Sequence, residues 1–252
     1  MGGDICRLIR AVLFDFWDTL VFAEHQENEK LRHLRISSLT GALLDAGFPV
    51  SSETVERTMD KVTEECDKIR KTGREVDLHT QVRMLMALLE IKGQNQRLSR
   101  RLWDVYANAV LSIELKVREG AETVLHSLRE NGYKTGLICN TYHSPSNVLR
   151  KIIQNFGLSH CFDVLMFSDE YGVPKPKPEI FLEVLTRLGV KPDEAVHVGD
   201  RPNLDVFGAK NAGVKAIHLR ITDNPYPPDL PKPDATIETL WQIPKILETL
   251  RF

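Results

Sequence analysis

The spacing of hydrophobic residues changes along the chain. The stretch Leu8–Phe14 is rich in branched and aromatic residues, which is typical of a strand, and it stops at Asp15. From residue 24 to residue 115, apolar residues recur every three or four positions, which predicts helices. Ser51 and Gly47 stand where a helix start and a helix end are expected. The pattern therefore predicts one strand followed by a block of helices.

The rest of the chain alternates between helical and strand-like patterns. Strands that alternate with helices indicate βαβ crossovers and a parallel sheet. The Pro-rich stretch 225–233 is expected to be a loop, and a helix over 237–250 is expected to close the chain. The predicted helices cover 119–130, 146–156, 178–188 and 203–212, and the predicted strands cover 133–139, 163–167, 195–198 and 215–219.

These elements predict an α/β protein of two parts. Residues 1–22 and 116–252 form the α/β core, and residues 23–115 form a helical domain inserted after the first strand. In such sheets, ligands bind at the carboxyl ends of the strands. Because the insert leaves at that end, we expect it to cover the site as a cap.

Composition narrows the partners and the compartment. Lys and Arg number 33 against 35 Asp and Glu, so no basic excess points to nucleic acid or a membrane surface. The four cysteines are scattered, which disfavours a zinc cluster or a disulfide framework. The start of the chain does not resemble a signal peptide, and no apolar run is long enough to span a bilayer. We expect a cytoplasmic protein, monomer or homodimer.

Polar residues that can take part in catalysis or bind a metal or phosphate follow several predicted core strands. Taken singly, each has an ordinary explanation as a turn former, a solvated lysine or a helix cap. Together they would gather at one edge of the sheet. Three carboxylates repel one another unless a cation joins them, and oxygen ligands suit magnesium, while a lysine suits a phosphate. The set comprises Asp15, Cys139, Asn140, Lys175, Asp200 and Asp205.

Longer segments around these residues resemble the haloacid dehalogenase-like superfamily. LFDFWDTLV, LICNT, FSDEYGVPKPKPEIF and HVGDRPNLDVFGAKNAG are similar to its four motifs, in the same order. The helical block between the first two is similar to the helical cap of the family. The resemblance implies a Rossmann-like core in which strand one is central and lies beside the strand leading to Asp200.

The resemblance also implies a mechanism. Asp15 would attack the phosphorus of a small phosphorylated substrate to give an aspartyl-phosphate that water then hydrolyses. Mg²⁺ would be held by the Asp15 carboxylate, the Trp17 carbonyl and Asp200, with Asp205 bound directly or through water. Lys175 would bridge Asp15 and the phosphate. Cys139 and Asn140 would donate hydrogen bonds to the phosphate from side chain or backbone.

Two positions depart from the phosphatase pattern of the family. Trp17 stands where a second aspartate usually serves as general acid and base, a function that contributes about 10²–10⁴ in rate. Asp18 is one residue further along the chain. Because neighbouring side chains in extended backbone point to opposite sides, Asp18 is not expected to take the place of the missing acid. Cys139, a weak hydrogen-bond donor, replaces the usual Ser or Thr of the second motif.

Three functions therefore remain open. The first is a magnesium-dependent phosphohydrolase that is slow or acts on a substrate with a good leaving group; whether Asp18 or another group replaces the missing acid is left open. The second is a 2-haloacid dehalogenase, whose nucleophile attacks carbon and needs no acid at position 17, although such enzymes dispense with the metal and typically lack the carboxylate matching Asp200. The third is a catalytically weakened binding or regulatory protein on the same fold.

Overall fold

The computed structural model describes residues 9–92, 95–222 and 224–250. Leu8, where the first strand was predicted to begin, lies outside these residues. The chain divides into two compact units, each described here by itself. One unit comprises the described residues of Met1–Phe22, Lys116–Asn140 and Ile153–Phe252, and the other comprises those of Ala23–Leu115 and Thr141–Ile152. Within the described part of the chain, no helix has the length and apolar character needed to cross a membrane.

The first unit contains a six-stranded parallel sheet in the order β5-β4-β1-β6-β7-β8. The predicted α/β class and the central position of strand one beside the strand leading to Asp200 are both confirmed. Most strands are apolar and buried on both faces, as parallel strands between helices must be. Their bounds are β1 Ala11–Phe14, β4 Lys134–Cys139, β5 Val164–Phe167, β6 Ala195–Gly199, β7 Lys215–Leu219 and β8 Ala235–Ile237.

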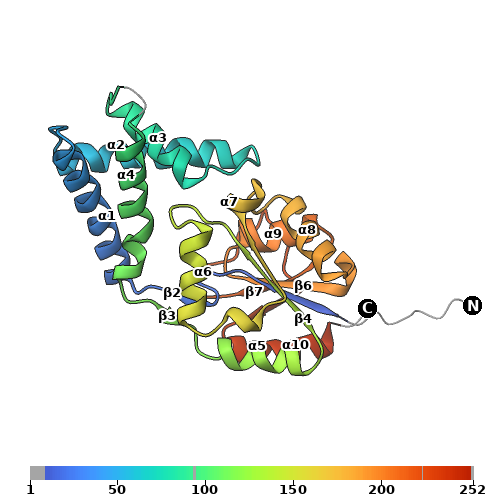
Figure 1. Ribbon diagram of the computed structural model, residues 1–252. Coiled ribbons are helices and arrows are strands. Elements are labelled where there is room, and N and C mark those ends of the chain that lie inside the picture. The colour runs from blue at the N-terminus through green and yellow to red at the C-terminus, as the bar shows by residue number, and fades with distance from the viewer. Residues whose placement is uncertain (1–8, 93–94, 223, 251–252) are drawn as a thin grey trace, which may run out of the picture. The chain divides into compact units, whose positions relative to one another are not determined.

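Helices cover both faces of this sheet (Figure 1). α5 (Ala121–Glu130) and α10 (Ile243–Thr249) lie on one face, and α8 (Pro178–Leu188) and α9 (Phe207–Asn211) lie on the other. An apolar cluster joins α8 to the strands through Phe181, Val184, Leu13 and Ile138. Gly136 makes this contact possible, because a Cβ there would stand 2.8 Å from Leu13 Cδ2 and 2.9 Å from Val184 Cγ1.

Two of the predicted helices differ from the observed structure. The helix predicted over 203–212 is a π-helical turn, Pro202–Val206, followed by α9. The helix predicted over 237–250 begins only at Ile243, after strand β8 and a 3-10 turn at Leu240–Gln242. β8 was not predicted, because a strand of three residues after a Pro-rich loop is too short to show a hydrophobic periodicity. It is a strand because it pairs with β7. The short helix α7 (Ser168–Tyr171) was also not predicted.

A two-stranded pair marks the ends of the helical insert. β2 (Val21–Phe22) pairs antiparallel with β3 (Lys116–Val117), so that Phe22 stands opposite Lys116. The chain leaves the core directly after β2 and returns to it at β3. The insert is therefore attached at two adjacent points.

The second unit is built from the predicted helical block. Side chains at the starts of three helices accept hydrogen bonds from backbone N–H groups two or three positions into the helix, as helix caps do: Ser51 from Thr54, Asp77 from Thr80 and Asn95 from Leu98. α6 (Ser146–Asn155) begins in the segment that groups with this unit. The other helices are α1 His25–Asp45, α2 Ser52–Lys71, α3 Leu78–Leu88, α4 Gln96–Asn108 and a 3-10 turn at Ala109–Ser112.

Candidate active site

A buried ion pair lies where β1 ends. Asp15 directly follows β1, and its backbone N–H donates to the carbonyl of Val198 on β6. Lys175 places its Nζ 2.5 Å from Asp15 Oδ1, although it is distant in sequence. Only 7% of Asp15 and 3% of Lys175 is exposed. Because an unpaired charge at such a depth would be costly, each residue stabilises the ionised form of the other.

Asp205 holds the other side of the same ammonium. Its Oδ1 accepts from Lys175 Nζ at 2.7 Å and from His197 Nε2 at 2.9 Å, and its Oδ2 accepts from the backbone N–H of Arg201 at 3.0 Å. Gly199 leaves room for this carboxylate, since a Cβ there would lie 2.3 Å from Asp205 Cγ. Both oxygens of Asp205 are thus engaged by the protein.

Asp200 completes a group of three carboxylates. It follows β6, and its Oδ1 accepts from Thr19 Oγ1 at 3.3 Å. One carboxylate oxygen from each of Asp15, Asp200 and Asp205 lies within 4.8 Å of the others. When all three are ionised, Lys175 leaves the group with two negative charges unbalanced, which matches a divalent cation.

The pKa values of these groups reflect the same imbalance. Burial, with Asp205 adding and Lys175 opposing, raises the pKa of Asp15 to about 6. Burial and the charges of Asp15 and Asp205 raise the pKa of Asp200 to about 8. Burial opposes ionisation of Asp205 too, but Lys175 and the hydrogen bond from His197 hold its pKa below the ordinary range. Without a cation, ionisation is therefore least favourable at Asp200 among the three carboxylates.

Asn140 positions Lys175 rather than pointing to solvent. Its Oδ1 accepts from the Lys175 backbone N–H at 2.8 Å, and its Nδ2 donates to the Lys175 carbonyl at 3.0 Å. Cys139, the last residue of β4, is fully buried, and its Sγ lies 3.5 Å from the Asn140 carbonyl. The structure thus brings Asp15, Asn140, Lys175, Asp200 and Asp205 together, with Cys139 directly behind Asn140.

The chain turns sharply after Trp17. Trp17 and Val21 pair through their backbones in an isolated β-bridge, and the Asp18 backbone N–H donates to the Val21 carbonyl at 2.8 Å. Asp18 has a φ of +60°, so the expectation based on extended backbone is wrong at this residue. Arg118 holds the turn by donating to the Asp18 carbonyl from Nε at 3.1 Å. Burial raises the pKa of the Asp18 carboxyl, with Arg201 and Arg118 opposing, and its charge in turn acts on Asp200.

Sequence reasoning missed three residues that support this site: His197, Thr19 and Arg118. His197 carried a signal, because it is a polar residue inside the apolar strand AVHVG and is 1% exposed. Burial lowers its pKa, which keeps the imidazole neutral. Thr19 and Arg118 carried none, since hydroxyls and arginines next to turns are common on protein surfaces.

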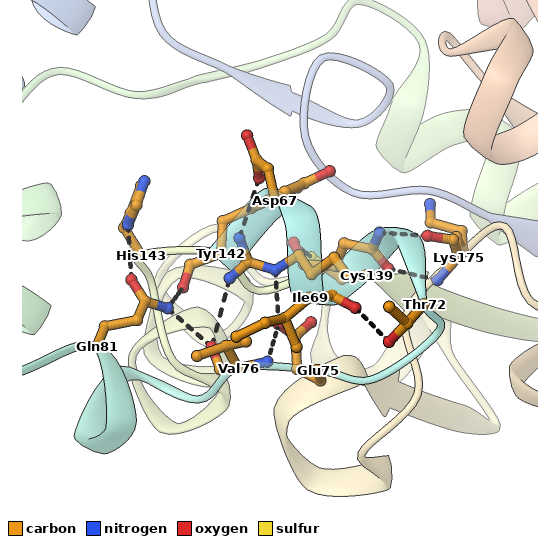
Figure 2. Close-up of polar contacts among 12 residues, drawn as sticks. Asp67, Ile69, Thr72, Glu75, Val76, Gln81, Cys139, Tyr142, His143 and Lys175 are labelled. Carbon is orange, nitrogen blue, oxygen red and sulfur yellow. Dashed lines mark hydrogen bonds and ion pairs between the residues drawn. The ribbon is translucent and has the colours of Figure 1, made fainter. Parts of the chain in front are cut away.

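Within the helical unit, a polar network holds the segment after Asn140 (Figure 2). Gln81 Nε2 donates to the Tyr142 carbonyl at 2.6 Å, and Gln81 Oε1 lies 2.9 Å from His143 Nδ1. Tyr106 Oη lies 3.1 Å from the same nitrogen. Burial and the charges of Arg35 and Arg70 lower the pKa of His143 to about 3. His143 is thus a neutral member of this network.

Comparison with known proteins places the chain in one family. Residues 9–213 match the family of haloacid dehalogenase-like hydrolases. The chain is 33% identical over 221 residues to a glyceraldehyde 3-phosphate phosphatase of Methanopyrus kandleri, covering 84% of each chain. It is 29% identical over 212 residues to a protein of the same name from Methanothermobacter thermautotrophicus, covering 83% of this chain and 85% of that protein.

Solved structures share the fold over almost the whole chain. A 2-haloacid dehalogenase from Pseudomonas syringae pv. Tomato superposes with a TM-score of 0.73 at 24% identity, covering 96% of this chain and 99% of that one. A haloacid dehalogenase-type phosphatase from Thermococcus onnurineus gives a TM-score of 0.64 at 25% identity, with 94% and 97% covered. From its sequence match, its fold and its buried Asp–Lys–Asp arrangement, the chain belongs to the haloacid dehalogenase-like hydrolases.

Proposed function

We propose that the protein is a magnesium-dependent phosphohydrolase that acts on a small phosphorylated substrate through an aspartyl-phosphate on Asp15. The observation that carries this proposal is the Lys175 ammonium bound between Asp15 and Asp205, with Asp200 beside them. A carboxylate beside a fixed cation is suited to attack a phosphate, whose negative charge would otherwise repel it. The relatives named as glyceraldehyde 3-phosphate phosphatases support a phosphate ester as substrate.

Asp15 supplies the nucleophilic oxygen. Its burial raises the free energy of the ionised form, and Lys175 offsets that penalty, so the carboxylate is both desolvated and charged. The ammonium cannot rotate away, because Asp205 holds it and Asn140 holds its main chain. Lys175 therefore stays where it can contact both Asp15 and an incoming phosphate oxygen.

The described carboxylates fit Mg²⁺ by charge and by donor type. We assign the Asp15 carboxylate, the Asp200 carboxylate and the Trp17 carbonyl as direct ligands. Asp205 would contribute through water, since its oxygens already accept from Lys175, His197 and Arg201. When bound, Mg²⁺ would neutralise charge on the phosphate and on the two aspartates.

The remaining contacts to the substrate depend on which side chains are already engaged or buried within the protein. Because Asn140 uses its side chain to hold Lys175, it would bind phosphate through its main chain, and so would the buried Cys139. Trp17 supplies no general acid toward the leaving oxygen, and the next carboxyl along the chain is that of Asp18. Its carboxyl is half-buried, its pKa is raised mainly by burial, and its charge is felt by Asp200.

The test is release of phosphate from a panel of phosphate esters with Mg²⁺ and again with EDTA. The panel begins with glyceraldehyde 3-phosphate and phosphoserine and includes an aryl phosphate. A 2-haloacid is assayed in parallel for release of halide. We expect turnover of a phosphate ester that EDTA abolishes. Metal-independent release of halide would instead favour the dehalogenase, and binding without turnover across the panel would favour a regulatory protein.

A single turnover in heavy-oxygen water separates the two covalent routes further. If water attacks phosphorus in the aspartyl-phosphate, the label enters inorganic phosphate. If an ester on Asp15 is hydrolysed at its carbonyl carbon, as dehalogenation requires, the label enters the Asp15 carboxylate. Mass spectrometry of the phosphate and of the peptide containing Asp15 distinguishes the two outcomes.

A further inference from the structure

A second group of metal-binding side chains lies in the core unit, away from the carboxylates. His126 is on α5, and His160 and Cys161 are in the 3-10 turn Ser159–Cys161. One nitrogen of each histidine and the thiol sulfur all lie within 4.8 Å of one another. The two histidines face each other with Nε2 atoms 3.0 Å apart and ring centroids 4.8 Å apart. The two nitrogens therefore lie next to each other and near the sulfur.

The surroundings of this group combine a buried thiol with charged residues on both sides of the balance. Cys161 is fully buried, His126 is half-buried and His160 is exposed, so the group reaches from the interior to the surface of the protein. Burial raises the pKa of the Cys161 thiol, with Arg129 opposing and Glu122 adding to the effect. Glu122 lies one helical turn before His126 on the same face of α5. The charge of Arg129 is partly offset by Asp163, whose Oδ1 is 3.2 Å away.

We propose that His126, His160 and Cys161 bind a borderline transition-metal ion of the Zn²⁺ type, and that Glu122, which lies outside this group, rotates its side chain in as the fourth ligand. Imidazole nitrogen, thiolate sulfur and carboxylate oxygen are the ligands that Zn²⁺ takes, in tetrahedral geometry. Neighbouring nitrogens around such an ion stand about 3.4 Å apart, from Zn–N distances of about 2.0–2.1 Å. The Nε2 atoms of His126 and His160 are 3.0 Å apart, so they need to separate by only a few tenths of an ångström. On binding, the Cys161 proton passes to solvent.

The location indicates a structural ion. The turn Ser159–Cys161 precedes β5, so it lies toward the amino ends of the parallel strands, whereas Asp15 and Asn140 follow their carboxyl ends. Thr135, at the start of β4, donates from Oγ1 to the Cys161 carbonyl at 2.6 Å. An ion here would join α5 to the segment that leads into β5, and would stabilise the core without touching the nucleophile.

The test uses the full-length protein, stripped of metal and then saturated with Mg²⁺ so that the carboxylate site is filled. Co²⁺ serves as the spectroscopic probe, followed by Zn²⁺. We expect a thiolate-to-cobalt charge-transfer band that saturates at one equivalent and disappears when Zn²⁺ displaces the probe. Zn²⁺ should also raise Tm, because it binds the folded protein, and phosphatase activity should remain that of the Mg²⁺ enzyme.

Variants assign the ligands. His160→Gln changes an exposed side chain, so its folding is not at stake, and it should weaken Co²⁺ binding by at least about tenfold and remove the Tm gain. Cys161→Ser should remove the charge-transfer band, and His25→Gln, an exposed histidine on α1, should change nothing. A band that persists in Cys161→Ser, or equal affinities for wild type and His160→Gln, would overturn the site. Unchanged affinity in Glu122→Gln would overturn the fourth ligand.

Discussion

Asn140 and Lys175 bind each other twice: the Lys175 backbone N–H donates to Asn140 Oδ1 at 2.8 Å, and Asn140 Nδ2 donates to the Lys175 carbonyl at 3.0 Å. Both residues are buried. Asn140 therefore fixes the point from which the Lys175 side chain starts, and thereby the distance from the ammonium to Asp15. A residue that the family resemblance assigns to phosphate binding acts here on the lysine.

We predict that Asn140→Ala damages both stability and turnover. The substitution leaves two buried backbone groups without partners, which should lower the free energy of unfolding by about 2–4 kcal/mol. Misplacement of Lys175 should lower kcat by about 10–100-fold, with a smaller effect on KM. Urea melts and steady-state kinetics measure the two effects. The matched control is Asn131→Ala, which removes an exposed 2.8 Å bond to the Ser127 carbonyl; a wild-type kcat in Asn140→Ala would contradict the prediction.

Asp15→Asn should reduce turnover to background. The amide keeps the size of the side chain but is not a nucleophile, so the covalent step cannot begin. Phosphate release and a thermal melt show whether the loss is chemical or results from unfolding. Asp45→Asn, which alters an exposed aspartate paired with Arg101, should keep wild-type activity. Turnover retained by Asp15→Asn in a contamination-free preparation would reject Asp15 as nucleophile.

Asp200→Asn and Asp205→Asn should differ in their effect on Mg²⁺. Loss of a charged direct ligand in Asp200→Asn should raise the Kd for Mg²⁺ by more than about tenfold. Asp205→Asn should raise it less, but should lower stability more, because the Asp205 carboxylate holds Lys175 and His197. Calorimetry and thermal melts check both. Equal Mg²⁺ affinities in the two variants would argue that both aspartates are direct ligands.

Metal-free protein should lose stability as the pH rises from about 6.5 to about 8. The folded protein keeps a proton on Asp200, with its pKa of about 8, whereas an unfolded aspartate titrates near 3.9. Because the folded state binds more protons in this range, the free energy of unfolding falls as pH rises. His143, whose lowered pKa gives the opposite slope, contributes only below about pH 6.5. Melts of wild type and Asp200→Asn, with and without Mg²⁺, should show the slope only in metal-free wild type; the same slope in Asp200→Asn would reject this assignment.

Trp17→Asp should restore a general acid if the enzyme lacks one. The control is Trp17→Asn, which opens similar space without a group that can donate a proton. On an alkyl phosphate, whose poor leaving group needs protonation, we expect the Asp variant to exceed the Asn variant by about tenfold or more. On an aryl phosphate the difference should be smaller. Equal rates for the two variants on both substrates would indicate that Asp18 or another group already protonates the leaving oxygen.

The sequence alone predicted the helices and strands that have a long hydrophobic pattern. β1, β4, β6 and β7 are buried on both faces, so their apolar runs are nearly continuous, and α8 runs over the predicted residues 178–188. β2, β3 and β8 have two or three residues each and exist through pairing, which one segment alone does not reveal. The left-handed backbone of Asp18 also follows from tertiary contacts, because its turn is held by Val21 and Arg118.

The site shows the same division between local and distant information. Asp15, Lys175 and Asp200 were found because each ends a strand or lies in a motif, which is local information. The pairing of Asn140 with Lys175 was not found, since an amide after a strand suits phosphate and backbone equally well. His197 differs again: its place in a buried strand was visible, but its partner Asp205 is set by how the chain folds back after Gly199.

The pairing of Phe22 with Lys116 has a consequence for how proteins of this kind diversify. The two residues stand opposite each other in an antiparallel pair, so a turn of two residues would close the same hairpin without any insert. Because the entropy of loop closure grows only slowly with length, a helical unit of another size or ancestry can occupy this position at little thermodynamic cost. Exchange at this junction leaves intact the strand order that aligns the nucleophile. The helical insert and the sheet that carries the nucleophile can therefore evolve as separate parts of one chain.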